Sequence, residues 1–292
     1  WLIDFFDKSL HAVLYAPVQT LKRPDQPQPD RGFAKRLVQF RLILRRDFCL
    51  REMGRQFVLG QTIEAAMERA TGMEARGFTY SYDMLGEAAL TEADAHRYFA
   101  AYRDAITRIG AASAGDDIFA APSISVKLSA LHPRYSFMHY DRVMQELVPR
   151  VAELAAHARE SGIAMTVDAE ESERLEISLQ VFERVYRDTA LREYEGLGLA
   201  LQTYQRRARS VLSFLTELAE DVGRRIPVRL VKGAYWDTEI KRAQVEGLPD
   251  FPVFTRKVAT DVSYICCARK LLGMTDRIYP QFATHNAHTL AA

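Results

Sequence analysis

The most constraining feature of this chain is a strand-then-helix pattern that recurs about six times. Short apolar runs predict strands, and longer segments with apolar residues at helical spacing follow them. The predicted strands span residues 78–85, 124–128, 163–168, 197–202, 227–231 and 278–284. The predicted helices cover residues 91–109, 140–159, 173–186, 206–221, 238–245 and 255–272, and another begins near Asn286. This alternation predicts parallel strands with crossover helices, in either a barrel or a doubly wound sheet.

Two observations favour the barrel. No strand-to-helix turn carries the glycine pattern that binds nucleotides in doubly wound sheets. In addition, almost every predicted strand ends in a polar or reactive residue, and in eight-fold barrels such strand ends build the site. These residues are Asp83, Lys127, Asp168, Gln202, Lys232 and His285. We therefore expect an α/β fold of the (βα)8 TIM-like type, with about six units visible and the C-terminal units missing.

Composition sets the broad class. With 292 residues and 48% hydrophobic content, the chain can bury a full core. A net charge of +1 gives no overall attraction for nucleic acid or anionic lipid. The cysteines Cys49, Cys266 and Cys267 have no metal-binding or disulfide spacing, which favours a reducing compartment. We find no signal peptide and no apolar run that could span a bilayer, and we expect the chain to be a piece of a longer protein.

The first quarter of the chain differs from the rest. Residues 1–75 are predicted to form a helical N-terminal arm, and residues 76–292 a barrel that is incomplete at its C-terminus. Within the arm, prolines interrupt helical periodicity over residues 16–32. The helix over residues 33–48 is rich in arginine, which we interpret as a solvated face on a packing arm rather than a membrane or nucleic-acid surface. The arm's predicted helices span residues 1–15, 33–48 and 61–74.

Lys127 needs an anionic partner. It lies between Val126 and Leu128 inside the second predicted strand, and burying an unpaired ammonium costs several kcal/mol. The partner could be Asp83, a ligand carboxylate, or both, so a role in a site is favoured. For Asp83 itself, a helix cap after the first strand is an equally good interpretation.

The third strand ends in an acidic run from Asp168 to Glu171. We interpret Glu170 and Glu171 as helix-start charges that complement the helix dipole. That leaves Asp168, at the strand tip, as the better site candidate.

Gln202 ends the fourth strand, and its amide can both donate and accept hydrogen bonds. This suits the edge of a heteroaromatic ring, although a satisfied core amide is the alternative. Arg229 lies within the fifth strand and requires a buried acceptor, because its guanidinium stays charged.

Directly after the fifth strand come a cation, a glycine and two aromatic residues, with no polar loop between. The glycine lets a ligand approach the backbone closely, and the aromatic rings can cover a flat ring. These residues are Lys232, Gly233, Tyr235 and Trp236. They predict a binding site at the end of this strand.

Two helix starts could hold an anion, because a helix N-terminus favours negative charge. One helix start follows the sixth strand. His285 lies there and could equally be a core histidine, whereas His288 is interpreted as structural. The other is a short motif of low specificity before the helix over residues 255–272. The residues concerned are Thr284, His285 and Asn286, and Thr255, Arg256 and Lys257.

Several longer motifs resemble the proline dehydrogenase domain of bacterial bifunctional proline utilization A proteins. The similarity runs from about Met53 to the end of the chain, with the motifs in the same order. The motifs are Ile124-Ser-Val-Lys-Leu-Ser-Ala-Leu-His-Pro-Arg134, Val167-Asp-Ala-Glu-Glu171, Arg229-Leu-Val-Lys-Gly-Ala-Tyr-Trp236 and Phe282-Ala-Thr-His-Asn-Ala-His-Thr-Leu290.

The resemblance implies a distorted (βα)8 barrel that binds FAD and oxidises L-proline to Δ1-pyrroline-5-carboxylate, the first step of proline catabolism. A quinone would then take the electrons. The resemblance also implies a bacterial cytoplasmic protein, with peripheral association with the inner membrane possible. It further implies that the polypeptide continues into an aldehyde dehydrogenase domain and that this segment binds no nucleic acid.

By the same resemblance, Lys127 would bind the proline carboxylate and pair with Asp83, while Tyr235 and Ala234 would contact the substrate. Arg229 and Asp168 would be catalytic, with Arg229 near the ring atom that accepts hydride. The flavin would be lined by Asp168, Gln202, Arg229, Val231, Lys232, Gly233, Ala234 and Trp236. The pyrophosphate, ribose or adenine end would be held by Thr255, Arg256, Lys257, Thr284, His285 and Asn286.

Two other functions compete with this one. A Schiff-base aldolase would use Lys127 or Lys232 as its amine nucleophile. A scaffold would instead dock a membrane or partner through the arginine-rich helix over residues 33–48. One departure from the family also bears on activity, since the helix that completes its substrate clamp is expected beyond Ala292.

Overall fold

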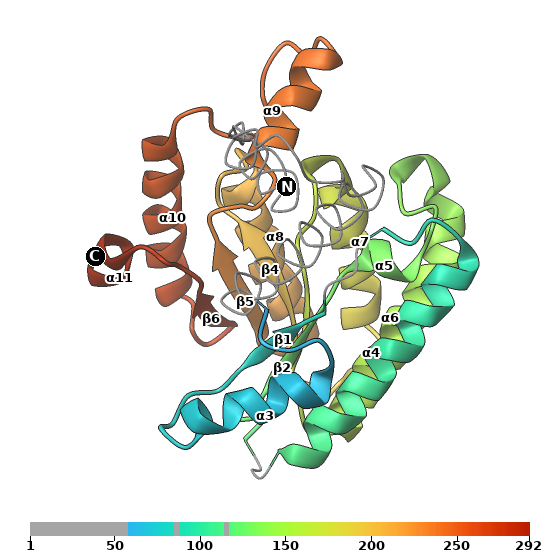
Figure 1. The fold of residues 1–292 in the computed structure, drawn as a ribbon. Coiled ribbons are helices and arrows are strands. Elements are labelled where there is room, and N and C mark those ends of the chain that lie inside the picture. The colour runs from blue at the N-terminus through green and yellow to red at the C-terminus, as the bar shows by residue number, and fades with distance from the viewer. Residues whose placement is uncertain (1–57, 85–87, 114–116) are drawn as a thin grey trace, which may run out of the picture. The chain divides into compact units, whose positions relative to one another are not determined.

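The computed structural model describes residues 58–84, 88–113 and 117–292. Residues Leu59–Ala292 form one compact unit, and every element named below belongs to it, with the labels of Figure 1. The predicted helices over residues 1–15 and 33–48 lie outside the described residues, so the helical arm stays a prediction.

Six parallel strands form one sheet, and their order in the sheet follows their order in the chain. This confirms the parallel arrangement that the strand–helix alternation predicts. The strands are β1 (Ser81–Asp83), β2 (Ser123–Val126), β3 (Met165–Val167), β4 (Leu197–Gln202), β5 (Ile226–Val231) and β6 (Ile278–Phe282).

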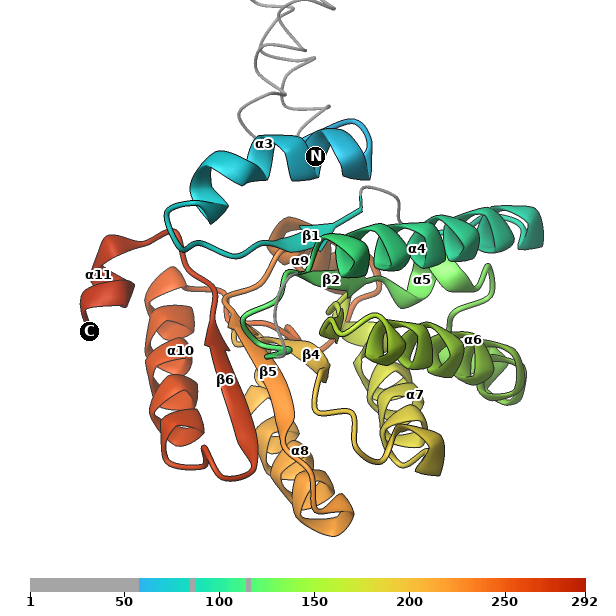
Figure 2. The same ribbon diagram turned by 90° about the horizontal axis from the view of Figure 1, so that it is seen from below.

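Helices connect these strands and cover the outside of the sheet. Figure 2 shows α4, α6, α7, α8 and α10 arranged around the strands. The α-helices are α3 (Ile63–Glu74), α4 (Glu92–Ala112), α5 (Leu128–Leu131), α6 (Tyr140–Glu160), α7 (Leu175–Tyr186), α8 (Ala208–Val222), α9 (Trp236–Val245), α10 (Lys257–Leu272) and α11 (Ala287–Ala291). Short 3-10 turns occur at η1 (Phe137–His139), η2 (Ser172–Arg174) and η3 (Thr189–Leu191). Among the helices described, none is both long enough and apolar enough to cross a membrane.

The two faces of the sheet differ in chemistry, because successive strand residues point to opposite faces. One face carries large apolar residues that belong to the buried core, such as Val126, Val167 and Leu199. The residues between them, which include Ser125 and Thr166, are small or polar. The apolar face therefore packs on the helices, and the other face is left for polar chemistry.

The sheet curves strongly. The Arg229 guanidinium on β5 donates to the Ser81 hydroxyl on β1 at 2.7 Å, although four strand-to-strand steps separate these strands. In a flat sheet four steps would span about 19 Å, beyond the reach of one side chain. The strands must therefore wrap around Arg229, as the wall of a TIM-like barrel does.

Two of the differences between predicted and observed strand boundaries have a clear cause. The first strand is shorter than residues 78–85, because Phe78 donates its backbone N–H to Met73 in the turn that ends α3. Lys127 lies just after β2 rather than inside a strand. Its N–H donates to the Tyr102 hydroxyl at 3.2 Å instead of to a neighbouring strand, and the chain then turns into α5.

The predicted start of α4 is confirmed in detail. The Thr91 hydroxyl accepts from the Asp94 N–H at 3.1 Å, and the Asp94 carboxylate accepts from the Thr91 N–H at 3.0 Å. This reciprocal capping satisfies two helix-end donors. It fixes where the connection from β1 enters its helix.

Candidate functional site at the strand ends

A cleft of about 640 Å³ lies at the C-terminal ends of the strands. It brings together most of the residues that the sequence singles out from separate strands. Those lining it are Asp83, Lys127, Asp168, Gln202, Val231, Lys232, Gly233, Ala234, Tyr235, Lys257, Thr284, His285 and Asn286. This is the face on which α/β barrels carry their sites.

Lys127 is at the centre of an ionic triad within this cleft. Its ammonium donates to Asp168 Oδ2 at 2.8 Å and to the two Asp83 oxygens at 3.0 and 3.1 Å. The Lys127 side chain is 7% exposed, whereas that of Asp83 is 47% exposed. Burial by itself would lower the pKa of Lys127, but Asp168 and Asp83 outweigh it and raise the pKa. Lys127 is therefore held as an ammonium.

Arg229 lies in the barrel interior and is not among the residues that line the cleft. Its guanidinium donates to the hydroxyls of Ser125 at 2.6 Å, Ser81 at 2.7 Å and Thr166 at 3.3 Å. Its acceptors are thus three neutral hydroxyls, of which those of Ser125 and Thr166 belong to buried residues and that of Ser81 to an exposed one. Burial lowers the pKa of Arg229, while Asp168 and Asp83 oppose that effect.

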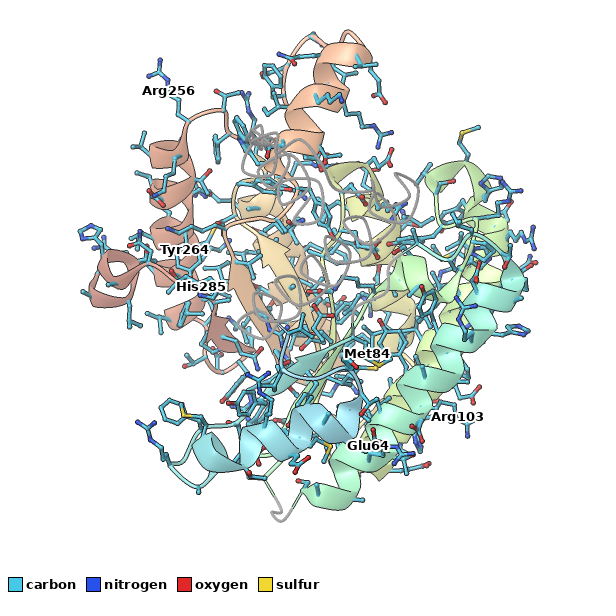
Figure 3. All side chains as sticks on the ribbon, viewed as in Figure 1. Glu64, Met84, Arg103, Arg256, Tyr264 and His285 are labelled. Atoms are coloured by element: carbon cyan, nitrogen blue, oxygen red, sulfur yellow. The ribbon has the colours of Figure 1, made fainter. Side chains whose placement is uncertain are left out.

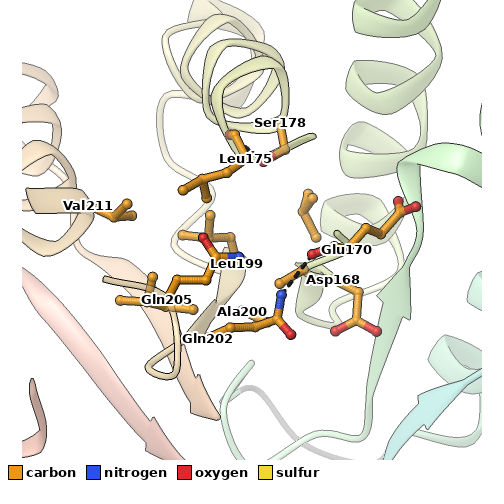
Figure 4. Close-up of a pocket in the computed structure, with 12 residues that line it drawn as sticks. Asp168, Glu170, Leu175, Ser178, Leu199, Ala200, Gln202, Gln205 and Val211 are labelled. Carbon is orange, nitrogen blue, oxygen red and sulfur yellow. Dashed lines mark hydrogen bonds between the residues drawn. The ribbon is translucent and has the colours of Figure 1, made fainter. Parts of the chain in front are cut away.

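Gln202 links two strand-end loops. Its Nε2 donates to the Glu170 carbonyl at 2.7 Å, and its Oε1 accepts from the Ala234 N–H at 3.1 Å. Figure 4 shows the first of these bonds next to Asp168. The residue is 2% exposed. Gln202 is therefore a satisfied buried amide that also lines the cleft, and its contact with a heteroaromatic ring stays a prediction.

The interpretation of Glu170 as a charge at the start of the helix that follows it is wrong, because its carboxylate binds the start of another helix, α5. Glu170 is 8% exposed, and its carboxylate accepts from the Ser129 N–H at 2.9 Å and from Arg174 at 2.7 Å. Burial raises the pKa of Glu170, although Ser129 and Arg174 act in the opposite direction. Glu170 therefore anchors the start of α5, which follows Lys127.

Gly233 is at a position that only glycine fits. Its φ is +144°, and an added Cβ would lie 2.5 Å from the ring of Tyr204. Tyr204 donates its N–H to the Lys232 carbonyl at 2.7 Å, which holds the ring beneath this turn. The backbone of residues 232–235 can therefore form a thin, flat wall of the cleft.

The far half of the cleft carries cations. The ammonium groups of Lys232 and Lys257 both bind Asp261 on α10 at 2.6 Å. Lys232 also donates to the Thr289 hydroxyl at 3.0 Å. Asn286 caps α11 by accepting from the Thr289 N–H. This end of the cleft therefore has the charge and helix termini that favour an anion.

Three predicted site residues lie beside the cleft rather than on its lining. Trp236 is 41% exposed and donates its ring N–H to the Phe254 carbonyl at 2.9 Å. Thr255 and Arg256 precede α10, and the Arg256 side chain projects outward (Figure 3). His285 is exposed, which contradicts the alternative of a core histidine.

Sequence reasoning missed two kinds of residue around the site. Ala169, Ala200 and Ala283 also line the cleft, where their small side chains leave room. The hydroxyls of Ser81, Ser125 and Thr166 were missed as well. Their signal was the strand period of two, because each stands two residues before Asp83, Lys127 or Asp168.

A curved parallel sheet with an ionic triad and a ligand-sized cleft at its strand ends defines a TIM-like α/β barrel with its site on the C-terminal face. A family model described as proline dehydrogenase matches residues 66–292. The chain belongs to the proline dehydrogenase family.

Similar proteins agree with this assignment. The chain is 56% identical over 246 residues to the bifunctional protein PutA of Salmonella typhimurium, which covers 84% of this chain and 19% of that protein. It is 24% identical over 237 residues to proline dehydrogenase 1 of Bacillus subtilis, covering 81% of this chain and 66% of the relative. The chain thus spans about a fifth of the length of the bifunctional relatives it matches.

Solved structures show the same fold. A mutant of Bradyrhizobium japonicum proline utilization A has a TM-score of 0.77 at 48% identity, covering 96% of this chain and 28% of that one. Proline utilization A from Bdellovibrio bacteriovorus, inactivated by N-propargylglycine, has a TM-score of 0.78 at 30% identity, covering 83% of this chain and 26% of the other.

Proposed function

We propose that this chain carries out the FAD-dependent oxidation of L-proline to Δ1-pyrroline-5-carboxylate. The observation that carries the proposal is the ammonium of Lys127 held between Asp83 and Asp168 at the floor of the cleft. Membership of the proline dehydrogenase family gives the reaction class. The Bdellovibrio relative, inactivated by N-propargylglycine, supports a substrate that is a secondary amine with a carboxylate.

The cleft residues fit FAD. Near Gly233 the wall of the cleft is backbone without a side chain, which suits a flat ring lying against it. Lys232 and Lys257 line the same cleft further along, where they would meet phosphates, together with Thr284 and His285. When bound, FAD supplies the acceptor for the hydride that leaves the substrate carbon.

The charges of the site favour a zwitterion as substrate. The Lys127 triad has two carboxylates and one ammonium, so a lone anion would meet an excess of negative charge. An amino acid brings a carboxylate for Lys127 and an amine for a carboxylate oxygen. Proline satisfies both, and holding both ends orients its ring against the cleft wall.

Oxidation of proline to the imine requires the amine to lose its proton. In this proposal Asp168 Oδ2, which accepts from Lys127 at 2.8 Å, accepts the hydrogen bond of the amine and receives that proton. Lys127 holds the substrate carboxylate, Tyr235 and Ala234 contact the ring, and Asp83 keeps Lys127 in place. Arg229 supports the acceptor's charge from below.

The geometry is less suited to a Schiff-base aldolase. A lysine nucleophile must be a neutral amine, but Asp168 and Asp83 raise the pKa of Lys127 and keep it charged. Lys232 is likewise paired with Asp261 at 2.6 Å. No observation within the described residues favours this second function.

The remaining partners are proposals of the same kind. The relatives named bifunctional support a native polypeptide that continues into an aldehyde dehydrogenase domain. We propose a quinone as the electron acceptor, and a bacterial cytoplasmic location that allows peripheral contact with the inner membrane. The domain boundary near residue 75 is also a proposal.

Absorbance spectroscopy of the native protein tests the function. We expect a yellow protein with flavin bands that proline bleaches under anaerobic conditions, and one equivalent of Δ1-pyrroline-5-carboxylate for each flavin reduced. A protein that contains flavin but is not bleached by proline would contradict the substrate. A colourless full-length protein that binds no added FAD would contradict the whole proposal.

A further inference from the structure

Two layers of side chains fill the barrel interior beneath the cleft. The upper layer is the triad of Asp83, Lys127 and Asp168. The lower layer holds three hydroxyls, each two residues earlier in the chain, on β1, β2 and β3. They belong to Ser81, Ser125 and Thr166, and all three accept hydrogen bonds from Arg229. We call this lower layer the hydroxyl cradle.

The hydroxyl cradle holds a cation with no counter-ion of its own. Among the residues that the structure describes, no carboxylate lies within ion-pairing distance of the Arg229 guanidinium. Buried arginines are ordinarily paired with an acid. Ser125 is 1% exposed and Thr166 is 3% exposed, so water cannot replace these two acceptors, whereas the third, Ser81, is exposed. Hydroxyls satisfy the N–H groups but leave the positive charge intact.

That charge acts on the layer above. The triad has an excess of one negative charge, which the guanidinium below balances. Burial lowers the pKa of Arg229, whereas electrostatic attraction by Asp168 and Asp83 raises it, so both carboxylates act on the guanidinium without a direct contact. The four charges therefore sum to zero before any ligand binds. A hydride that reaches an acceptor in the cleft adds one negative charge, which the guanidinium is placed to stabilise from below.

We propose that Ser81, Ser125 and Thr166 are positioning residues that hold Arg229 beneath the cleft without a direct ion pair, where it favours reduction of the bound cofactor. This inference rests on the proposed function, because it needs a flavin in the cleft. A carboxylate in place of a hydroxyl would fix the arginine equally well but would cancel its charge. Neutral acceptors are thus the feature on which the proposal depends.

A purely structural cradle is the competing explanation. Barrel interiors are usually filled by branched apolar residues, and three hydroxyls around an arginine could serve only to fill space. In that case removing one hydroxyl would change stability and nothing else. The two explanations differ in the reduction potential of the flavin.

The experiment compares Ser125→Ala with Ser125→Thr and Ser123→Ala in the full-length flavin-bound protein. Ser125→Ala removes the acceptor at 2.6 Å, so the guanidinium turns toward Asp83 or Asp168 and forms a direct ion pair. We expect a shift of about tenfold toward the oxidised flavin, equal to about 30 mV for two electrons. Ser125→Thr keeps the hydroxyl, and Ser123→Ala removes one from the same strand that does not contact Arg229; both should keep the wild-type potential.

Each outcome decides a different question. A yellow Ser125→Ala protein with the wild-type midpoint potential overturns the inference and leaves the proposed function standing. Equal shifts in Ser125→Ala and Ser123→Ala also overturn it. A wild-type protein that binds no flavin removes the proposed function and this inference with it. If Ser125→Ala fails to fold, Thr166→Val and Thr166→Ser form the corresponding pair, with a smaller shift expected from the 3.3 Å contact.

Discussion

At the scale of single residues, the two buried cations are held in opposite ways. Lys127 lies between two carboxylates, whereas Arg229 lies among three hydroxyls. An ammonium between two acids is fixed in place and can exchange one acid for a ligand carboxylate. A guanidinium whose acceptors are neutral hydroxyls has a charge that can act on the cleft from a distance. Lys127 is therefore suited to contact a substrate, and Arg229 to act on the cleft electrostatically.

Replacing Lys127 by alanine tests its role as carboxylate partner. Removing the charged partner of a bound carboxylate should cost about 2–5 kcal/mol in proline binding, and the two remaining carboxylates would repel the substrate. FAD content should stay at the wild-type level. Steady-state kinetics and flavin absorbance measure both, with Lys241→Ala on the exposed side of α9 as control. An unchanged Michaelis constant in a flavin-replete Lys127→Ala protein would refute the role.

Gly233→Ala tests the wall of the cleft. The added Cβ would meet the Tyr204 ring at 2.5 Å, and φ is +144°. We expect a loss of several kcal/mol in unfolding free energy or a protein that no longer retains FAD, because both the turn and the ring must move. Gly247→Ala is the matched control.

Gly247 also has a positive φ, of +62°, but an added Cβ there would meet nothing within 4 Å. Its cost should be limited to the left-handed conformation, about 1–2 kcal/mol. Equal losses in the two variants, measured by chemical denaturation, would show that close approach to Tyr204 is unimportant.

At the scale of elements, the loops after the strands are tied to one another. Gln202 links the loops after β3 and β5, and Glu170 links the loop after β3 to α5. A third tie joins α9 to the same loop, since Glu239 accepts from the Ser172 N–H at 2.6 Å and from its hydroxyl at 2.5 Å. These ties hold residues from separate strands in one arrangement.

Glu239→Ala should therefore destabilise the site from outside it. Glu239 is 3% exposed, and its loss would leave the Ser172 donors without their acceptor, at about 1.5–3 kcal/mol for a charged hydrogen bond. Glu239→Gln keeps one acceptor oxygen and should lose less. Urea unfolding curves of the two variants measure the difference. A Glu239→Gln protein as unstable as Glu239→Ala would show that the charge matters and not the acceptor.

Much of the arrangement of strands and helices could be predicted from the sequence, because each has a characteristic periodicity of apolar residues. Strand–helix alternation predicted the parallel sheet, and all six of the polar residues predicted at the strand ends line the cleft. Side chains that tie loops together carry no periodic signal. Glu170 looks like any acid before a helix, and only the approach of the Ser129 N–H from another loop makes it a buried anchor. The sequence predicted Lys127 inside a strand, which is wrong because its N–H donates to the Tyr102 hydroxyl and not to a neighbouring strand. No sequence pattern reveals that bond.

At the scale of the whole molecule, His132 is a buried titratable group that should make folding sensitive to acid. His132 is 1% exposed. Its Nδ1 accepts from the Arg134 N–H at 3.1 Å, and its Nε2 lies 3.1 Å from Glu146. This pattern requires the neutral ring. Burial lowers the pKa of His132 below 6.5, although Glu146 acts in the opposite direction.

Because the folded-state pKa lies below the unfolded value of 6.5, the stability from neutral His132 is present above that pH and is lost as the pH falls. We expect the wild-type protein to lose more unfolding free energy between pH 7.5 and 5.5 than His132→Gln does. Replacement of the exposed His96 should leave the wild-type pH dependence unchanged. If the unfolding free energies of wild type and His132→Gln change equally with pH, His132 is not the cause of the acid sensitivity.

The order of the sheet also has a consequence for how the protein is made. Each strand pairs with the one that follows it in the chain, so the wall can grow strand by strand as the polypeptide leaves the ribosome. The bond between Ser81 and Arg229 is different, because it joins positions 148 residues apart. During synthesis the first three strands must wait, with their hydroxyls solvated, until β5 arrives. The chemistry of the site is therefore completed late, after most of its scaffold already exists.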